Sequence, residues 1–69
     1  MKIIYHENDD ILFIKFSQLP IVRDESVNWN INIGYTTEGI CEMTILDAQK
    51  SGFYPLQIER VRAEAAQFV

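Results

Sequence analysis

The sequence predicts an α+β fold, in which a small antiparallel sheet of about four strands, arranged as a hairpin meander, precedes a C-terminal helix. Three patterns predict this fold: two apolar runs around a polar turn near the N-terminus, a ten-residue alternation of apolar and polar residues over 26–35, and helical spacing of apolar residues in 53–69. A chain of 69 residues has room for one domain, which we place at 1–69.

The first hairpin comes from two strand-forming runs, 3–5 and 11–16, which flank a polar, turn-prone segment at 6–10. Within the second run, Ile11 and Phe13 alternate with Leu12 and Ile14. The hairpin is therefore apolar on both faces, and one helix can cover only one of them. We expect Ile11 and Phe13 to lie on the face that stays open.

The alternation over 26–35 predicts one strand with one buried face, and it places Trp29 in the core. Residues 36–39 then form a tight loop, in which Gly39 can adopt a positive φ. The return strand covers 40–46 and carries Cys41 on its apolar face, where a cysteine behaves as a small hydrophobe. Before this hairpin, the connector around Pro20 leaves room for a short edge strand at 21–23.

The stretch from Asp47 to Gly52 has the pattern of one capped helical turn. Aspartate is a preferred N-cap, because its carboxylate accepts a hydrogen bond from a free backbone N–H of the first turn. Glycine ends such a turn with a left-handed conformation. We therefore interpret Asp47 and Gly52 as structural caps and not as a catalytic or metal-binding pair.

The predicted C-terminal helix occupies 53–69 and follows the sheet and turn of residues 1–50. Its apolar residues fall at positions i, i+3, i+7 and i+10, which is one helical stripe: Ile58, Val61, Ala65 and Phe68. We expect Ile58, Val61 and Phe68 to join Ile11 and Phe13 in a contact surface.

Composition excludes several classes of function. The net charge is -4, and the 6 lysines and arginines are scattered, so the dense basic patch that direct nucleic-acid binding needs is missing. No segment approaches the roughly 20 apolar residues of a membrane span, and the N-terminus lacks the pattern of a signal peptide. With 1 cysteine, an internal disulfide is excluded, and a reducing cytoplasmic setting is expected.

The polar turn His6, Glu7, Asp9 and Asp10 is the only cluster with metal-ligand chemistry. A calcium loop needs about six oxygen ligands and a glycine turn, and this loop is short and has no glycine. We therefore expect no metal, no cofactor and no catalytic residue. The alternative is a small enzyme or a ligand- or metal-binding protein that uses this His6 loop.

Short motifs occur along residues 1–50 in a fixed order: Tyr5 near the end of a strand, Asp10–Ile14, Glu38–Gly39, and Met43–Ala48. This order resembles a family of small bacterial and archaeal proteins known only as a domain of unknown function, family number 2283. Its members have a Tyr-Asp strand end, an Asp-x-Leu-Tyr-Ile strand, an Asp-Gly-type turn and a Gly-Ile-Glu-Ile-Leu-x-Ala run.

Several acidic residues of that family pattern are replaced here. His6 stands for an aspartate, Thr44 for a glutamate, and Gly34 and Thr36 occupy positions where aspartates are common. Any shared function of those acids is therefore not expected in this chain. Some relatives are encoded beside small toxin-like proteins, and the resemblance implies an antitoxin-like role as one candidate.

Together these observations predict a non-catalytic protein-interaction module. A chain this short gains little stability from its own core, and a symmetric dimer is a common way to cover an open apolar face. We expect a homo-oligomer, with a small basic protein such as a toxin as the alternative partner.

Overall fold

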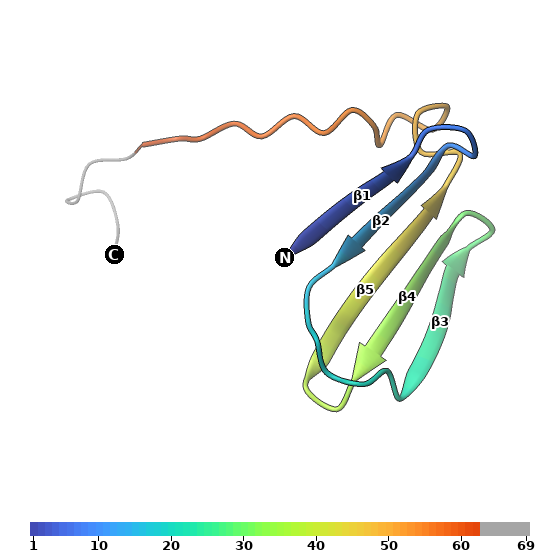
Figure 1. The fold of residues 1–69 in the computed structure, drawn as a ribbon, viewed down its shortest axis with the longest axis vertical. Helices are drawn as coiled ribbons and strands as arrows, with labels where there is room; N and C mark the ends of the chain where they lie inside the picture. Colours follow the sequence, from blue (N-terminus) through green and yellow to red (C-terminus); the bar gives the residue numbers. More distant parts are fainter. Residues whose placement is uncertain (63–69) are drawn as a thin grey trace.

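The chain folds into a five-stranded antiparallel sheet (Figure 1). The computed structural model describes residues 1–62. The strands are β1 (Lys2–His6), β2 (Ile11–Lys15), β3 (Arg23–Asn28), β4 (Ile31–Thr36) and β5 (Gly39–Leu46). Their order across the sheet is β1-β2-β5-β4-β3.

The last strand in the chain is the central strand of the sheet. After β2, the connector 16–22 carries the chain past the position of β5 to the far edge, where β3 begins (Figure 1). Two hairpins then return the chain inward, so β5 pairs with β4 on one side and with β2 on the other. With 8 residues, β5 is also the longest described strand, which suits a strand that holds two neighbours.

The strand registers define two faces. Tyr5, Leu12, Ile45 and Ile31 form one cross-strand row. Because side chains alternate along each strand, the same face carries the next row of the same strands. We call it the apolar face, and its residues in β1, β2, β4 and β5 include Ile3, Tyr5, Leu12, Ile14, Ile31, Ile33, Met43 and Ile45. At the β3 edge the same side carries Glu25, which lies opposite Ile33. The opposite side, the mixed face, includes Ile4, Ile11, Phe13, Asn32, Glu42 and Thr44.

The core lies at one end of the apolar face. Leu12 and Ala48 have no exposed surface, and Ile45 retains 3%. Half-buried side chains pack around these three residues: Tyr5, Ile14, Ile31, Met43 and Tyr54. Ala48 and Tyr54 follow β5, so the turn after the sheet closes over this end of the face.

The expected C-terminal helix is absent from the described residues, and the prediction of an α+β fold is therefore wrong. Residues 53–62 contain neither helix nor strand, while Ile58 and Val61 are 87% and 77% exposed. Ala65 and Phe68 lie outside the described residues. Helices of this length are marginal in water unless an apolar stripe packs on something, and no sheet face lies under this segment. Within residues 1–62, no helix is long or apolar enough to cross a membrane.

The alternation over 26–35 is a hairpin and not one strand. The carboxamide oxygen of Asn28 accepts hydrogen bonds from the backbone N–H groups of Asn30 and Ile31, each at 3.0 Å, and so bends the chain between β3 and β4. Trp29 lies at the tip with 72% of its surface exposed, which corrects its predicted place in the core. The buried residue of the tip is Asn30, whose Nδ2 donates to the carbonyl oxygen of Leu46 at 3.2 Å.

The loop between β4 and β5 has the predicted conformation. Gly39 has a φ of 130°, which L-residues with a side chain rarely adopt. Thr36 is buried and supports the loop, because its hydroxyl accepts from Glu38 N–H and donates to the Gly39 carbonyl. The return strand therefore starts where the glycine predicts.

Candidate functional site

The densest polar network in the described residues is centred on Asp10, which ends the turn between β1 and β2. Its carboxylate accepts the Tyr5 hydroxyl at 2.8 Å, the Gln49 N–H at 2.7 Å and the Lys50 N–H at 3.3 Å. Its carbonyl accepts the Ala48 N–H at 3.0 Å. One residue of the first hairpin thus holds the turn that follows β5.

These donors set the charge state of Asp10. The backbone N–H of Gln49 is the largest cause that lowers the pKa of the Asp10 carboxyl below its usual value, and the Tyr5 hydroxyl and Lys50 N–H act in the same direction. Partial burial acts the other way and is outweighed. Asp10 is therefore an anion at neutral pH that accepts hydrogen bonds from fixed donors.

Tyr5 is held by the same carboxylate and by a second aromatic ring. The hydrogen bond to Asp10, followed by partial burial and the nearby negative charge, raises the pKa of Tyr5 to about 12. Its ring stacks on Tyr54, with centroids 3.7 Å apart and planes within 9°. A phenol with this pKa stays protonated, so Tyr5 serves as a hydrogen-bond donor and as the platform on which the chain after the turn rests.

The structure gives the capping role expected of Asp47 to a different carboxylate. Asp47 has a φ of 50°, and it joins the turn through its backbone carbonyl, which accepts Ser51 N–H at 2.9 Å. An N-cap residue has extended backbone and caps through its side chain; here the carboxylate that accepts the turn's N–H groups belongs to Asp10. Gly52 has a φ of 85°, as expected for the glycine that ends a turn.

The acidic turn of the first hairpin does not assemble a metal centre in the described residues. His6, Glu7 and Asp9 are exposed, whereas the oxygens of Asp10 are occupied by the donors described above. No group of three or more histidine, cysteine, aspartate or glutamate side chains within 1–62 is placed to hold a metal ion.

Cys41 is buried, as its apolar neighbours predict. Its side chain has no exposed surface, and Sγ lies 3.4 Å from the carbonyl oxygen of Ser17 and 3.5 Å from that of Leu19. The thiol therefore fastens β5 to the connector. Burial leaves it inaccessible to a substrate in this conformation.

Within the described residues, those predicted as a contact surface lie in two separate places. Ile11 and Phe13 are half-buried on the mixed face, opposite the face that carries Leu12. Ile58 and Val61 lie in the extended segment after the sheet, and Phe68 lies outside the described residues. Away from the core, the apolar face carries the exposed Ile3 and the half-buried Ile14, Ile33 and Met43, and no second layer of described residues covers this part (Figure 1).

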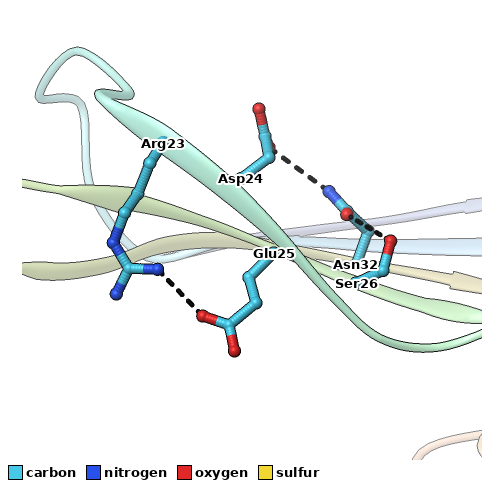
Figure 2. Close-up of polar contacts among 5 residues, drawn as sticks. All are labelled: Arg23, Asp24, Glu25, Ser26 and Asn32. Carbon is cyan, nitrogen blue, oxygen red and sulfur yellow. Dashed lines mark hydrogen bonds and ion pairs between the residues drawn. The ribbon is translucent and has the colours of Figure 1, made fainter.

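The β3 edge is a polar network that the sequence analysis did not identify (Figure 2). On one side of the strand, Arg23 Nη1 pairs with Glu25 Oε2 at 2.8 Å, and the guanidinium lies 4.0 Å from the ring centroid of Tyr35. On the other side, Asn32 Nδ2 donates to Asp24, and the Asn32 carboxamide oxygen accepts the hydroxyl of Ser26, both at 3.3 Å. The signal in the sequence is the charged run 23–25, which is typical of an edge strand protected from pairing.

These features define a class: a small, single-sheet domain with one open apolar face and a terminal turn tied down by an aspartate. The chain belongs to the family described as "Protein of unknown function (DUF2283)", whose model matches residues 2–49. This match confirms the expected family. No curated protein and no solved structure matches the chain.

The matched range covers the part of the chain in which the motifs meet. It contains every described strand and the Asp10 network except Lys50, and it ends within the turn. Residues from three motifs meet in the structure: Tyr5 bonds to Asp10, and Leu12 packs with Ile45 and Ala48. The motifs therefore specify the corner where the first hairpin, β5 and the turn join. Residues 53–62 lie outside the match.

Proposed function

We propose that this domain is a non-catalytic protein-interaction module that self-associates through its apolar face. The observation that carries the proposal is an apolar sheet face without a second layer in the described residues. A sheet with one hydrophobic face is stable when that face packs on another element.

The exposed area of the chain supports a partner of this kind. The chain exposes 5716 Å², whereas a compact folded monomer of its mass, 8.0 kDa, exposes about 4,500 Å². The excess is about 1,200 Å² and includes the exposed residues 55–62 as well as the uncovered sheet, and it is larger than the roughly 800 Å² that each partner contributes to a standard interface. A second copy brings an identical apolar face and can form a two-layer sandwich with sheets about 10 Å apart.

The described side chains also favour binding over catalysis. An active site needs an acid or base beside a nucleophile or a stabilising group. In this chain Cys41 is buried against carbonyl oxygens, Tyr5 has a raised pKa, and His6 is exposed at a strand end. The single cysteine, buried as a free thiol, suits a reducing compartment, and we place the domain in the cytoplasm.

Two neighbouring residues of β4 provide a matched test. Ile33 lies on the apolar face opposite Met43, whereas Asn32 lies on the mixed face opposite Thr44. We expect the unmodified chain to sediment above 8.0 kDa, with a mass that rises over about a hundredfold range of concentration. Ile33→Lys should shift it to the monomer, and Asn32→Lys should leave association intact.

Circular dichroism at the lowest concentration separates lost association from lost folding. If Ile33→Lys does not fold, Ile33→Thr keeps a β-branched side chain and takes its place. A mass of 8.0 kDa for the unmodified chain at every concentration would overturn the proposal. Dissociation by Asn32→Lys alone would move the contact to the mixed face.

The net charge of -4 favours a second candidate, an antitoxin-like complex with a small basic protein. A monomeric chain that binds a basic partner, with affinity that falls as salt rises, would support it. Association that is insensitive to salt and lost in Ile33→Lys supports self-association instead.

A further inference from the structure

Residues 55–62, which we call the C-terminal arm, leave the sheet as an extended segment (Figure 1). Every residue of the arm is exposed, and Ile58 and Val61 are more exposed than most apolar side chains of the sheet. The chain's radius of gyration is 15.0 Å, compared with about 11 Å for a compact chain of this length. The arm is thus an apolar-bearing segment with no partner among the described residues.

The arm starts beside a free sheet edge. Tyr54, the residue before the arm, stacks on Tyr5 of β1. In the described sheet β1 pairs only with β2, so its outer backbone N–H and C=O groups have no strand beside them. The central residues of β1 are Ile3, Ile4 and Tyr5, which are strand formers.

The two edge strands of the sheet, β1 and β3, differ in how readily another strand can pair with them. β3 has charged residues at three consecutive positions, and its side chains form one ion pair and hydrogen bonds (Figure 2). Charged residues discourage edge-to-edge pairing. β1 has no such run, so the edge open to strand addition is the edge from which the arm departs.

We propose that the C-terminal arm of one chain adds as a strand to the β1 edge of a second copy. This inference rests on the proposed self-association, and it identifies the C-terminal arm as the segment that the two copies exchange. Strand addition satisfies the outer backbone groups of β1 and removes an exposed edge. In the arm, Leu56 and Ile58 alternate with Gln57 and Glu59, the period that places like residues on one face of a strand.

The reach of the arm favours the second copy. The arm runs away from its own β1 (Figure 1). Eight extended residues span about 26–29 Å, whereas two packed sheets lie about 10 Å apart. The arm can therefore cross to a partner sheet and still pair along most of a strand the length of β1.

Chemical cross-linking of isotopically mixed chains tests the exchange. The probe is the full chain with Ile4→Cys and Ile58→Cys, prepared in light and heavy nitrogen forms, mixed in equal amounts, unfolded, refolded together and treated with a flexible bis-maleimide. Cys41 is buried and should not react, and the unsubstituted chain checks this. We expect links between β1 and the arm, with one light and one heavy peptide in about half of them, the value for random pairing between copies. The control replaces Ile4→Cys by Glu25→Cys on β3, and should give no links.

Sedimentation of the same mixture separates the two proposals. Associated chains whose links never combine light and heavy peptides would mean that the arm pairs with its own β1, and the exchange would be overturned while self-association stands. Associated chains without links, or with links to Glu25→Cys instead, would also overturn the exchange. A monomer at all concentrations would overturn both proposals.

Discussion

The half of the sheet formed by β1, β2 and β5 differs from the β3–β4 hairpin in what holds it. The first half contains the buried side chains of Leu12 and Ile45 and the Asp10 network that ties down the final turn. In β3, by contrast, all six residues are exposed, and polar pairs such as Arg23 with Glu25 occupy both sides of the strand.

This difference assigns most of the stability to the first half, whereas the apolar face that we propose for association also includes Ile31 and Ile33 of β4. Burial of apolar side chains contributes far more to folding than exposed ion pairs, which contribute about 0–1 kcal/mol each. The half with the buried side chains therefore contributes most of the folding stability, and it supplies most of the apolar face that we propose as the interface. The polar hairpin widens the sheet and closes its other edge to pairing. In this small domain, a change that weakens the core also alters the surface we propose as the interface.

The largest expected effect comes from truncating the core. Leu12→Ala removes a side chain with no exposed surface and should lower the free energy of unfolding by about 2–5 kcal/mol. Val27→Ala, in β3 at 56% exposed, should change it by about 0.5 kcal/mol or less. Urea denaturation at one fixed protein concentration measures both, because association makes stability depend on concentration. Equal losses of unfolding free energy in the two variants would show that both halves of the sheet contribute alike to stability, contrary to the difference described above.

The sequence predicted those parts of the fold that depend on local pattern. The first hairpin follows from two apolar runs around a polar turn, and the return strand after Gly39 follows from a glycine with a positive φ. The burial of Cys41 follows from its place among alternating apolar residues. These features need only period-two alternation and turn chemistry.

The features that were missed depend on contacts between distant residues. The alternation through Trp29 is equally compatible with one strand or two, and the Asn28 side chain decides for a turn. Asp10 and Gln49 are 39 residues apart, so nothing local indicates which aspartate holds the turn. The helical stripe of the C-terminal segment is a pattern that forms a helix only when a surface packs against it.

The next largest effect on stability is expected at Asp10, and Asp47 provides the control because the two aspartates share a backbone conformation. Asp10 and Asp47 have φ values of 54° and 50°, so an alanine at either site meets similar backbone strain. Only Asp10→Ala also removes the acceptor for Tyr5 and for two backbone N–H groups. The melting temperature should fall clearly further for Asp10→Ala than for Asp47→Ala. The reverse order would return the capping role to Asp47.

The pH dependence of stability should reflect the same corner. The pKa of Asp10 is lowered by folding, so its contribution is fully present above the usual carboxyl pKa of about 3.9 and is lost as pH falls through the folded value. The pKa of Tyr5 is raised from 10.0 to about 12, so its contribution is present below 10.0 and is lost as pH rises toward about 12. Melting temperatures measured across pH should show both losses, which we call the acid limb and the alkaline limb of the stability profile.

Two variants assign these limbs to their residues. Asp10→Asn cannot ionise and should flatten the acid limb relative to the unmodified chain. Tyr5→Phe keeps the ring that stacks on Tyr54 but removes the hydroxyl, and should flatten the alkaline limb. An unchanged alkaline limb in Tyr5→Phe would place the loss elsewhere in the chain.

The smallest effect is expected at the tip of the polar hairpin. Trp29 is 72% exposed and is the only tryptophan, so its fluorescence reports on this tip alone. Trp29→Ala should change the free energy of unfolding by about 0.5 kcal/mol or less, because few contacts are removed. In the unmodified chain, the emission should have the long wavelength of an indole in water at every concentration, since Trp29 lies at the tip between β3 and β4 and outside the residues that form the apolar face. A shift to shorter wavelength as the chain associates would place Trp29 in the interface, where tryptophan is often an anchor. The tip of the β3–β4 hairpin would then take part in binding, and the contact would extend beyond the apolar face.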